Sequence, residues 1–77
     1  MTSRYLVDAP TSAHVTIREC EGESRYRQRL MELGVRPGAR ATVLQRTAGG
    51  GLVLGVNGAR IALDRSMTRR IEIDEEA

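Results

Sequence analysis

Aromatic residues and cysteines are nearly absent from this sequence of 77 residues. It contains no Trp or Phe, two Tyr and a single cysteine, Cys20. One cysteine cannot form an internal disulfide and offers no CxxC pair for zinc. The core must therefore come from aliphatic side chains, and a chain this short buries only about 60% of its unfolded surface. We expect one small domain over residues 1–77, without a deep pocket.

Long apolar runs are also missing. No stretch approaches the roughly 20 apolar residues of a membrane-spanning helix. The first residues do not form the apolar run of a signal peptide either. The hydrophobic content of 40% is too high for a disordered chain. These features together predict a folded cytoplasmic protein in a reducing compartment.

Lysine is absent too, so all 12 basic residues are arginines, and the formal net charge is +2. The body of the chain is basic, whereas residues 74–77 form an acidic tail. A basic body is one feature of nucleic-acid-binding proteins. However, the arginines are scattered along the chain, and no aromatic residues alternate with them to stack on bases. We therefore expect a solvated surface of mixed charge and no nucleic-acid binding.

Alternation of apolar and polar residues predicts five short antiparallel strands. They lie at residues 14–20, 40–46, 52–56, 59–63 and 71–73. Asn57-Gly58 is a strong signal for a two-residue hairpin between the third and fourth of them. We expect residues 1–13 to be an arm and residues 65–68 to form one helical turn. Frequent turns between short strands favour a mainly β fold, a small barrel that hides its own edges.

Residues 24–34 form the one convincing helix. Ser24 is the expected N-cap, and Gly34 is the expected left-handed residue after the last turn. The turn Pro37-Gly38 then prevents the helix from resuming. An apolar stripe at helical spacing should pack against the strands. Its members are Tyr26, Leu30 and Leu33.

Two residues at the edge of this stripe, Arg27 and Met31, are candidates for contact with a partner. Arginine is enriched at interfaces, and methionine is an adaptable contact residue. We expect a flexible glycine loop to close over a segment docked there. The loop consists of Ala48, Gly49, Gly50 and Gly51. The alternative is that Met31 simply completes the core beside Leu30.

The residue types that catalysis and metal binding require are sparse. His14 and Cys20 are the only histidine and the only cysteine, and six residues separate them. On a straight strand this separation is roughly 20 Å, so they cannot pair as base and nucleophile or share a metal ion. We expect no catalytic residue, no cofactor and no metal site within one monomer. Weak metal binding, or a metal bridging two copies, stays open.

Residues 27–38, Arg-Gln-Arg-Leu-Met-Glu-Leu-Gly-Val-Arg-Pro-Gly, resemble the ferrous-iron transport protein A family (FeoA). The family pattern is Arg-Leu-x-x-Leu-Gly-[Ile/Val/Met]-x-Pro-Gly, followed by a strand, a Gly-Gly loop, a hairpin, an Ala-Leu pair and a late Ile. The matching residues here are Gly49-Gly50, Asn57-Gly58, Ala62-Leu63 and Ile71. The resemblance covers roughly residues 5–74. Thr68 departs from it, because the family has a late Ala there.

The resemblance implies an SH3-like barrel and a small cytosolic protein that assists bacterial ferrous-iron uptake. Such a protein is not an enzyme; it binds the cytosolic region of the FeoB-type membrane transporter, which recruits it to the inner face of the membrane. Two other classes remain open. One is the C-terminal domain of iron- or manganese-dependent repressors, which have DNA-binding and dimerisation domains upstream, whereas this chain starts at Met1. The other is an SH3-like nucleic-acid-binding module. Homo-oligomers also stay open.

Overall fold

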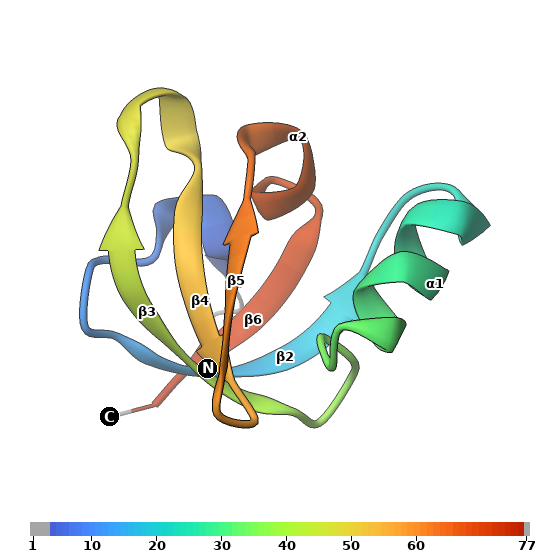
Figure 1. Cartoon of the computed structure of the whole chain (residues 1–77), viewed down its shortest axis with the longest axis horizontal. Coiled ribbons are helices and arrows are strands. Elements are labelled where there is room, and N and C mark those ends of the chain that lie inside the picture. The colour runs from blue at the N-terminus through green and yellow to red at the C-terminus, as the bar shows by residue number, and fades with distance from the viewer. Residues whose placement is uncertain (1–3, 77) are drawn as a thin grey trace.

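A computed structural model describes residues 4–76 of the chain. Six antiparallel strands form one sheet in the order β1-β6-β2-β3-β4-β5, with helix α1 at its side and the single turn α2 at one end (Figure 1). The strands are β1 Arg4–Tyr5, β2 His14–Cys20, β3 Arg40–Arg46, β4 Leu52–Val56, β5 Ala59–Leu63 and β6 Ile71–Glu75. The helical segments are η1 Leu6–Asp8, α1 Ser24–Glu32, η2 Ala48–Gly50 and α2 Arg65–Thr68. The mainly β fold class is confirmed, with one strand more than expected.

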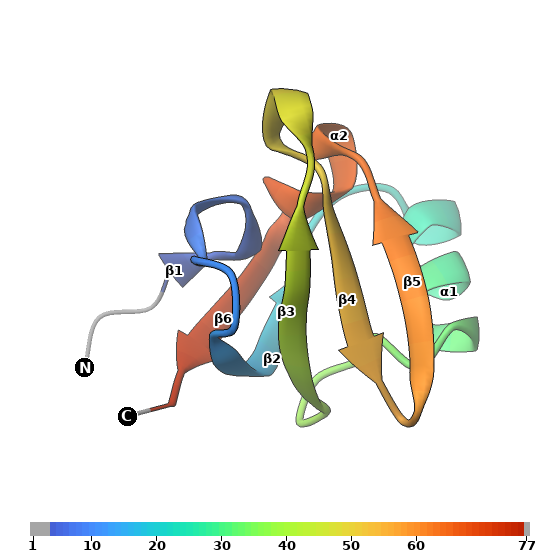
Figure 2. The same cartoon turned by 60° about the vertical axis from the view of Figure 1, so that its left-hand side comes forward.

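The sheet curls around a single layer of aliphatic side chains but does not close into a barrel. Inward-facing residues alternate along β4, where Leu52, Leu54 and Val56 are all buried. Within residues 4–76, β1 and β5 are the two edges, and Figure 2 shows them on opposite sides of the view. β1 has only two residues and pairs with β6, so it does not reach the free side of β5. The prediction that the sheet hides its own edges is therefore wrong.

The segment expected to be an arm contributes two residues to the core. Leu6 and Ala9 are both fully buried, and the turn η1 places them against the sheet. The Arg46 guanidinium donates a 2.5 Å hydrogen bond to the Ala9 carbonyl oxygen. A strand of two residues shows no alternation, which explains why the sequence pattern missed it. Residues 1–3 of the predicted arm lie outside the described residues.

An extra residue in β2 changes which face its end presents. Ile17 lies opposite Ile73, but Cys20 lies opposite Ile71, because the pairing register shifts between Ile17 and Glu19. The shift is a β-bulge, and it turns the Cys20 side chain into the core. His14, at the start of the strand, is exposed. The two side chains therefore lie on opposite faces, unlike those of a straight strand.

Helix α1 spans Ser24–Glu32, so it ends two residues before the predicted bound, and its N-cap also differs from the prediction. The N-cap is Glu23, not Ser24, and no side chain accepts a hydrogen bond there. At the other end Gly34 has φ +96°. The Val35 amide donates to the Leu30 carbonyl at 2.8 Å, and the Gly34 amide donates to the Met31 carbonyl at 3.0 Å. This is the Schellman arrangement, in which the buried Val35 packs next to the buried Leu30.

Two turns have the geometry that their residues predict. Asn57 and Gly58 have φ +52° and +77°, as a type I′ hairpin requires. Gly38 has φ +91° in the turn after Pro37, and its amide donates a 2.8 Å hydrogen bond to the Ile17 carbonyl. The exit from α1 is thereby joined to β2. The prediction that residues 74–77 form a tail is wrong in part, because β6 extends to Glu75. Ala77 lies outside the described residues.

Candidate functional site

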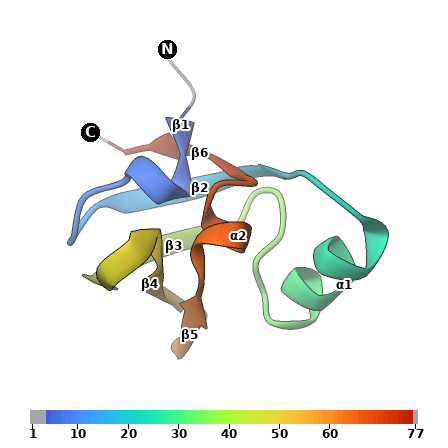
Figure 3. The same ribbon diagram turned by 90° about the horizontal axis from the view of Figure 1, so that it is seen from above.

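Helix α1 is attached to the rest of the molecule mainly through two side chains, the buried Leu30 and the half-buried Tyr26. Leu30, 2% exposed, is the only buried residue of the helix. Figure 3 shows α1 lying beside the sheet. The other residues of the helix are exposed and open to contact from outside.

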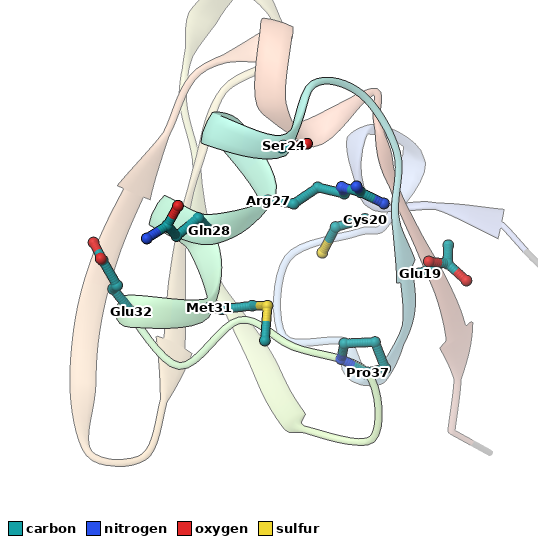
Figure 4. Close-up of a pocket in the computed structure, with 8 residues that line it drawn as sticks. All are labelled: Glu19, Cys20, Ser24, Arg27, Gln28, Met31, Glu32 and Pro37. Carbon is teal, nitrogen blue, oxygen red and sulfur yellow. The ribbon is translucent and has the colours of Figure 1, made fainter.

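A groove of about 600 Å³ lies between one flank of α1 and the end of β2. Its walls come from α1, from the end of β2 and from the turn before β3. The lining residues are Glu19, Cys20, Ser24, Arg27, Gln28, Met31, Glu32 and Pro37. Arg27 and Met31 extend from the helix toward β2, and the Cys20 thiol points back toward the helix (Figure 4). The groove thus combines an apolar floor with charged residues at its rim.

The Cys20 thiol is held in its neutral form. Burial raises its pKa, the nearby carboxylate of Glu19 raises it further, and the Arg27 guanidinium opposes both effects. The sulfur lies 3.9 Å from the carbonyl oxygen of Val35. A neutral, partly covered thiol behaves as a small apolar side chain. Cys20 therefore adds to the apolar floor, and its chemistry as a nucleophile is suppressed.

The structure brings together two of the predicted contact residues, Arg27 and Met31. Met31 is 51% exposed, so the alternative that it completes the core is wrong. Arg27 forms no ion pair with a carboxylate of residues 4–76, because the salt bridges there involve other arginines. Its charge is therefore available to a partner. The sequence did not single out the other groove residues as partner contacts. For Cys20 the reason is the β-bulge, which turns its side chain inward and cannot be read from the alternation in β2.

The glycine loop lies elsewhere. Residues 48–51 are next to α2, where the Thr68 hydroxyl donates a 2.8 Å hydrogen bond to the Gly50 carbonyl. The Thr47 amide also donates to the Gly51 carbonyl at 2.9 Å, which closes the loop on itself. None of these residues lines the groove. The structure therefore does not support the expectation that this loop closes over a segment docked at Arg27 and Met31.

The predicted apolar stripe is buried only in part. Tyr26 is half-buried, with the guanidinium carbons of Arg25 and Arg70 at 5.4 and 5.7 Å from its ring centre. Leu33 is 43% exposed, so the prediction that it belongs to the core is wrong. The physical reason is the chain reversal at Gly34, which brings Val35 into the position beside Leu30.

Metal-ligating side chains do not gather within residues 4–76. No three His, Cys, Asp or Glu residues of this part of the chain are placed to hold one ion. His14 Nδ1 instead lies 3.1 Å from the hydroxyl of Thr42. Among the described residues, no helix has the length and apolarity needed to span a membrane.

Several solved structures share this fold at low sequence identity. An iron uptake regulatory protein (FeoA) has a TM-score of 0.85 at 22% identity, with 99% of this chain and 100% of that chain covered. The FeoA protein from Chlorobium tepidum has a TM-score of 0.88 at 24% identity, with 96% and 71% covered. A manganese-dependent transcriptional repressor has a TM-score of 0.86 at 17% identity, but the chain spans only 42% of it. These matches show an SH3-like fold.

The sequence itself was also compared with protein families and with curated proteins. No curated protein matches it. The family model of the FeoA domain matches residues 4–75, nearly the whole of the described chain. This chain therefore belongs to the FeoA family.

Proposed function

We propose that this protein assists ferrous-iron uptake in the cytoplasm by binding the cytosolic region of a FeoB-type membrane transporter. Membership of the FeoA family supports the link to iron transport. A role in binding a partner rather than in catalysis agrees with the placement of His14 and Cys20. They lie on opposite faces of β2 and cannot exchange a proton. In this proposal the transporter recruits the protein to the inner face of the membrane.

The groove beside α1 is the surface we assign to this contact, and the exposure of Met31 is the observation that carries the assignment. A methionine side chain 51% exposed at an apolar groove adapts to side chains of different shape. The adjacent Arg27 adds a charge that orients the partner. A volume of about 600 Å³ admits a few side chains of a docking segment.

A second candidate function is that of an SH3-like regulatory domain, related to the C-terminal domain of iron- or manganese-dependent repressors, that acts on the DNA-binding part of such a protein. The observation that favours it is the match to two structures of manganese-dependent repressors, with TM-scores of 0.86 and 0.88. This chain spans 42% and 38% of those proteins, so it corresponds to one part of them. The two candidates differ in their partner, which is a membrane transporter in one case and a DNA-binding protein in the other.

The proposal is tested by capturing the transporter's purified cytosolic region on the immobilised protein. Met31→Glu places a charge in the apolar floor and should weaken capture about tenfold or more. The matched control is Leu44→Glu, because Leu44 is also exposed, at 42%, but lies on β3 away from the groove. Both variants should melt like the wild type, since neither side chain is buried.

Three outcomes decide between the candidates. Loss of capture by Met31→Glu but not by Leu44→Glu supports the groove as the contact. Equal capture by both variants assigns the contact to another surface. No capture of the transporter by the wild type, together with capture of a metal-dependent repressor, would favour the regulatory domain.

A further inference from the structure

Strand β5 has one side without a partner. It pairs with β4 through residues 52–56, and within residues 4–76 no strand lies on its other side. Figure 2 shows β5 at the edge of the sheet. The edge at β1 is different, because that strand has two residues whereas β5 has five.

The hairpin fixes which backbone groups point outward from β5. A type I′ turn of two residues makes the flanking pair, Val56 and Ala59, a hydrogen-bonded pair. Hydrogen-bonded and non-hydrogen-bonded pairs alternate along an antiparallel ladder. Arg60, opposite Gly55, and Ala62, opposite Val53, are therefore non-hydrogen-bonded positions. Their N–H and C=O groups point away from β4, and no other backbone group of the described chain bonds to them.

This edge lacks several of the devices that prevent another strand from pairing with it, and its one charged side chain is Arg60. Natural edge strands are protected by charged side chains, by proline, by bulges or by covering segments. β5 contains no proline, and its register with β4 runs without a shift, whereas β2 and β3 both contain irregularities. Arg60 and Ala62 are both exposed. A regular and uncovered edge of this kind is a template for β-strand addition.

We propose that the β5 edge binds an extended acidic segment of a partner protein as an added strand. The charge of the edge selects such a segment. Arg60 is exposed on the strand and takes no part in the ion pairs of residues 4–76. The carboxylate of Asp64, which follows β5, is turned to the next element, because its Oδ1 accepts hydrogen bonds from the Ser66 hydroxyl and the Met67 amide.

Charge also argues against a second copy of the chain as the occupant. Antiparallel pairing of two β5 strands about Ile61 would place Arg60 of each copy opposite Ala62 of the other. The two arginines would then be diagonal neighbours on one face, where like charges repel. An acidic strand instead places carboxylates beside Arg60. This surface is separate from the groove beside α1, so it does not depend on the function proposed above.

The test measures amide hydrogen exchange in the intact protein by NMR. In the free protein, the amides of Ile61 and Leu63 should be protected and those of Arg60 and Ala62 should exchange rapidly. The probe is a short blocked peptide in which Glu and Val alternate, added at millimolar concentration. We expect it to slow exchange at Arg60 and Ala62 about tenfold or more, and a peptide with Lys in place of Glu to have a much smaller effect.

Ala62→Pro is the variant that removes the outward N–H, at a position where an edge strand tolerates proline. It should abolish the effect of the Glu–Val peptide at Arg60, whereas Ala62→Val, which keeps the N–H, should retain it. If Ala62→Pro melts earlier than the wild type, Arg60→Glu replaces it, and this variant should reverse the preference between the two peptides. The proposal is overturned if Arg60 and Ala62 stay unprotected with the Glu–Val peptide. It is also overturned if they become protected when the protein alone is concentrated, which would assign the edge to a second copy.

Discussion

The Thr68 hydroxyl donates a 2.8 Å hydrogen bond to the carbonyl oxygen of Gly50. Thr68 is fully buried and ends α2, while Gly50 ends η2, so this bond joins two turns that are distant in the sequence. Gly50 also packs against the side chain of Arg65, whose carbons would lie 3.1 Å from an added Cβ. The polar side chain that departs from the FeoA pattern is thus satisfied inside the core.

Replacing Thr68 with Val should reveal the cost of losing this bond. Val has nearly the same shape but cannot donate, so the half-buried Gly50 carbonyl would lose its hydroxyl partner. We expect the free energy of unfolding to fall by about 0.5–1.5 kcal/mol, measured by urea denaturation. Thr68→Ser keeps the donor and loses only a methyl group, so it should cost less than Thr68→Val. The opposite order would show that packing, and not the hydrogen bond, dominates at this position.

Gly34→Val tests the chain reversal after α1. Gly34 has φ +96°, and an added Cβ would lie 3.1 Å from the side-chain amide nitrogen of Asn57. A β-branched residue is strained in this backbone conformation, so the variant should lose about 1–2 kcal/mol or more of stability. The matched control is Gly38→Val, because Gly38 has φ +91° but nothing within 4 Å of an added Cβ. Gly34→Val should have the lower urea midpoint, and equal midpoints would mean that contact with Asn57 adds nothing to the strain.

Leu30→Ala and Leu33→Ala test how α1 is attached. Leu30 is 2% exposed and is the only buried residue of the helix, so its truncation should cost about 2–5 kcal/mol. Leu33 is 43% exposed, and its truncation should stay within about 0.5 kcal/mol. Chemical denaturation of both variants measures the difference. Similar losses for the two would contradict Leu30 as the main attachment of the helix.

Local signals in the sequence predicted the turns and most strands. Asn57-Gly58, Pro37-Gly38 and Gly34 each need a positive φ at a defined place, and the structure has these values. The alternation of Val15 and Ile17 also predicted which face of β2 is buried. These features depend on neighbouring residues, so one sequence carries enough information to find them.

Features that depend on distant residues were not predictable in this way. The bulge that buries Cys20 exists because of the pairing between β2 and β6, and the burial of Leu6 depends on the curled sheet. Leu33 fitted the helical stripe, yet Val35 occupies the buried position beside Leu30 after the chain reverses. Arg27 and Met31 were singled out correctly as neighbours, but the groove that joins them to Cys20 and Pro37 required the tertiary structure.

The N-cap of α2 predicts a pH dependence of stability. The hydrogen bond from the Ser66 hydroxyl lowers the pKa of Asp64, and the Met67 amide lowers it further, while partial desolvation opposes both. A carboxyl group whose pKa is lower in the folded protein stabilises the fold above its ordinary pKa. This contribution is lost as the pH falls from the ordinary pKa through the lowered one.

Ser66→Ala removes the largest of these effects. The pKa of Asp64 should then rise toward its ordinary value, and stability should fall less between neutral and acidic pH than it does in the wild type. Ser66→Thr keeps a hydroxyl and should titrate like the wild type. The measurement is an NMR titration of the Asp64 carboxyl carbon, with urea midpoints determined at neutral and acidic pH. If Asp64 titrates identically in the Ala and Thr variants, the hydroxyl does not hold the carboxylate, and the cap depends on the Met67 amide instead.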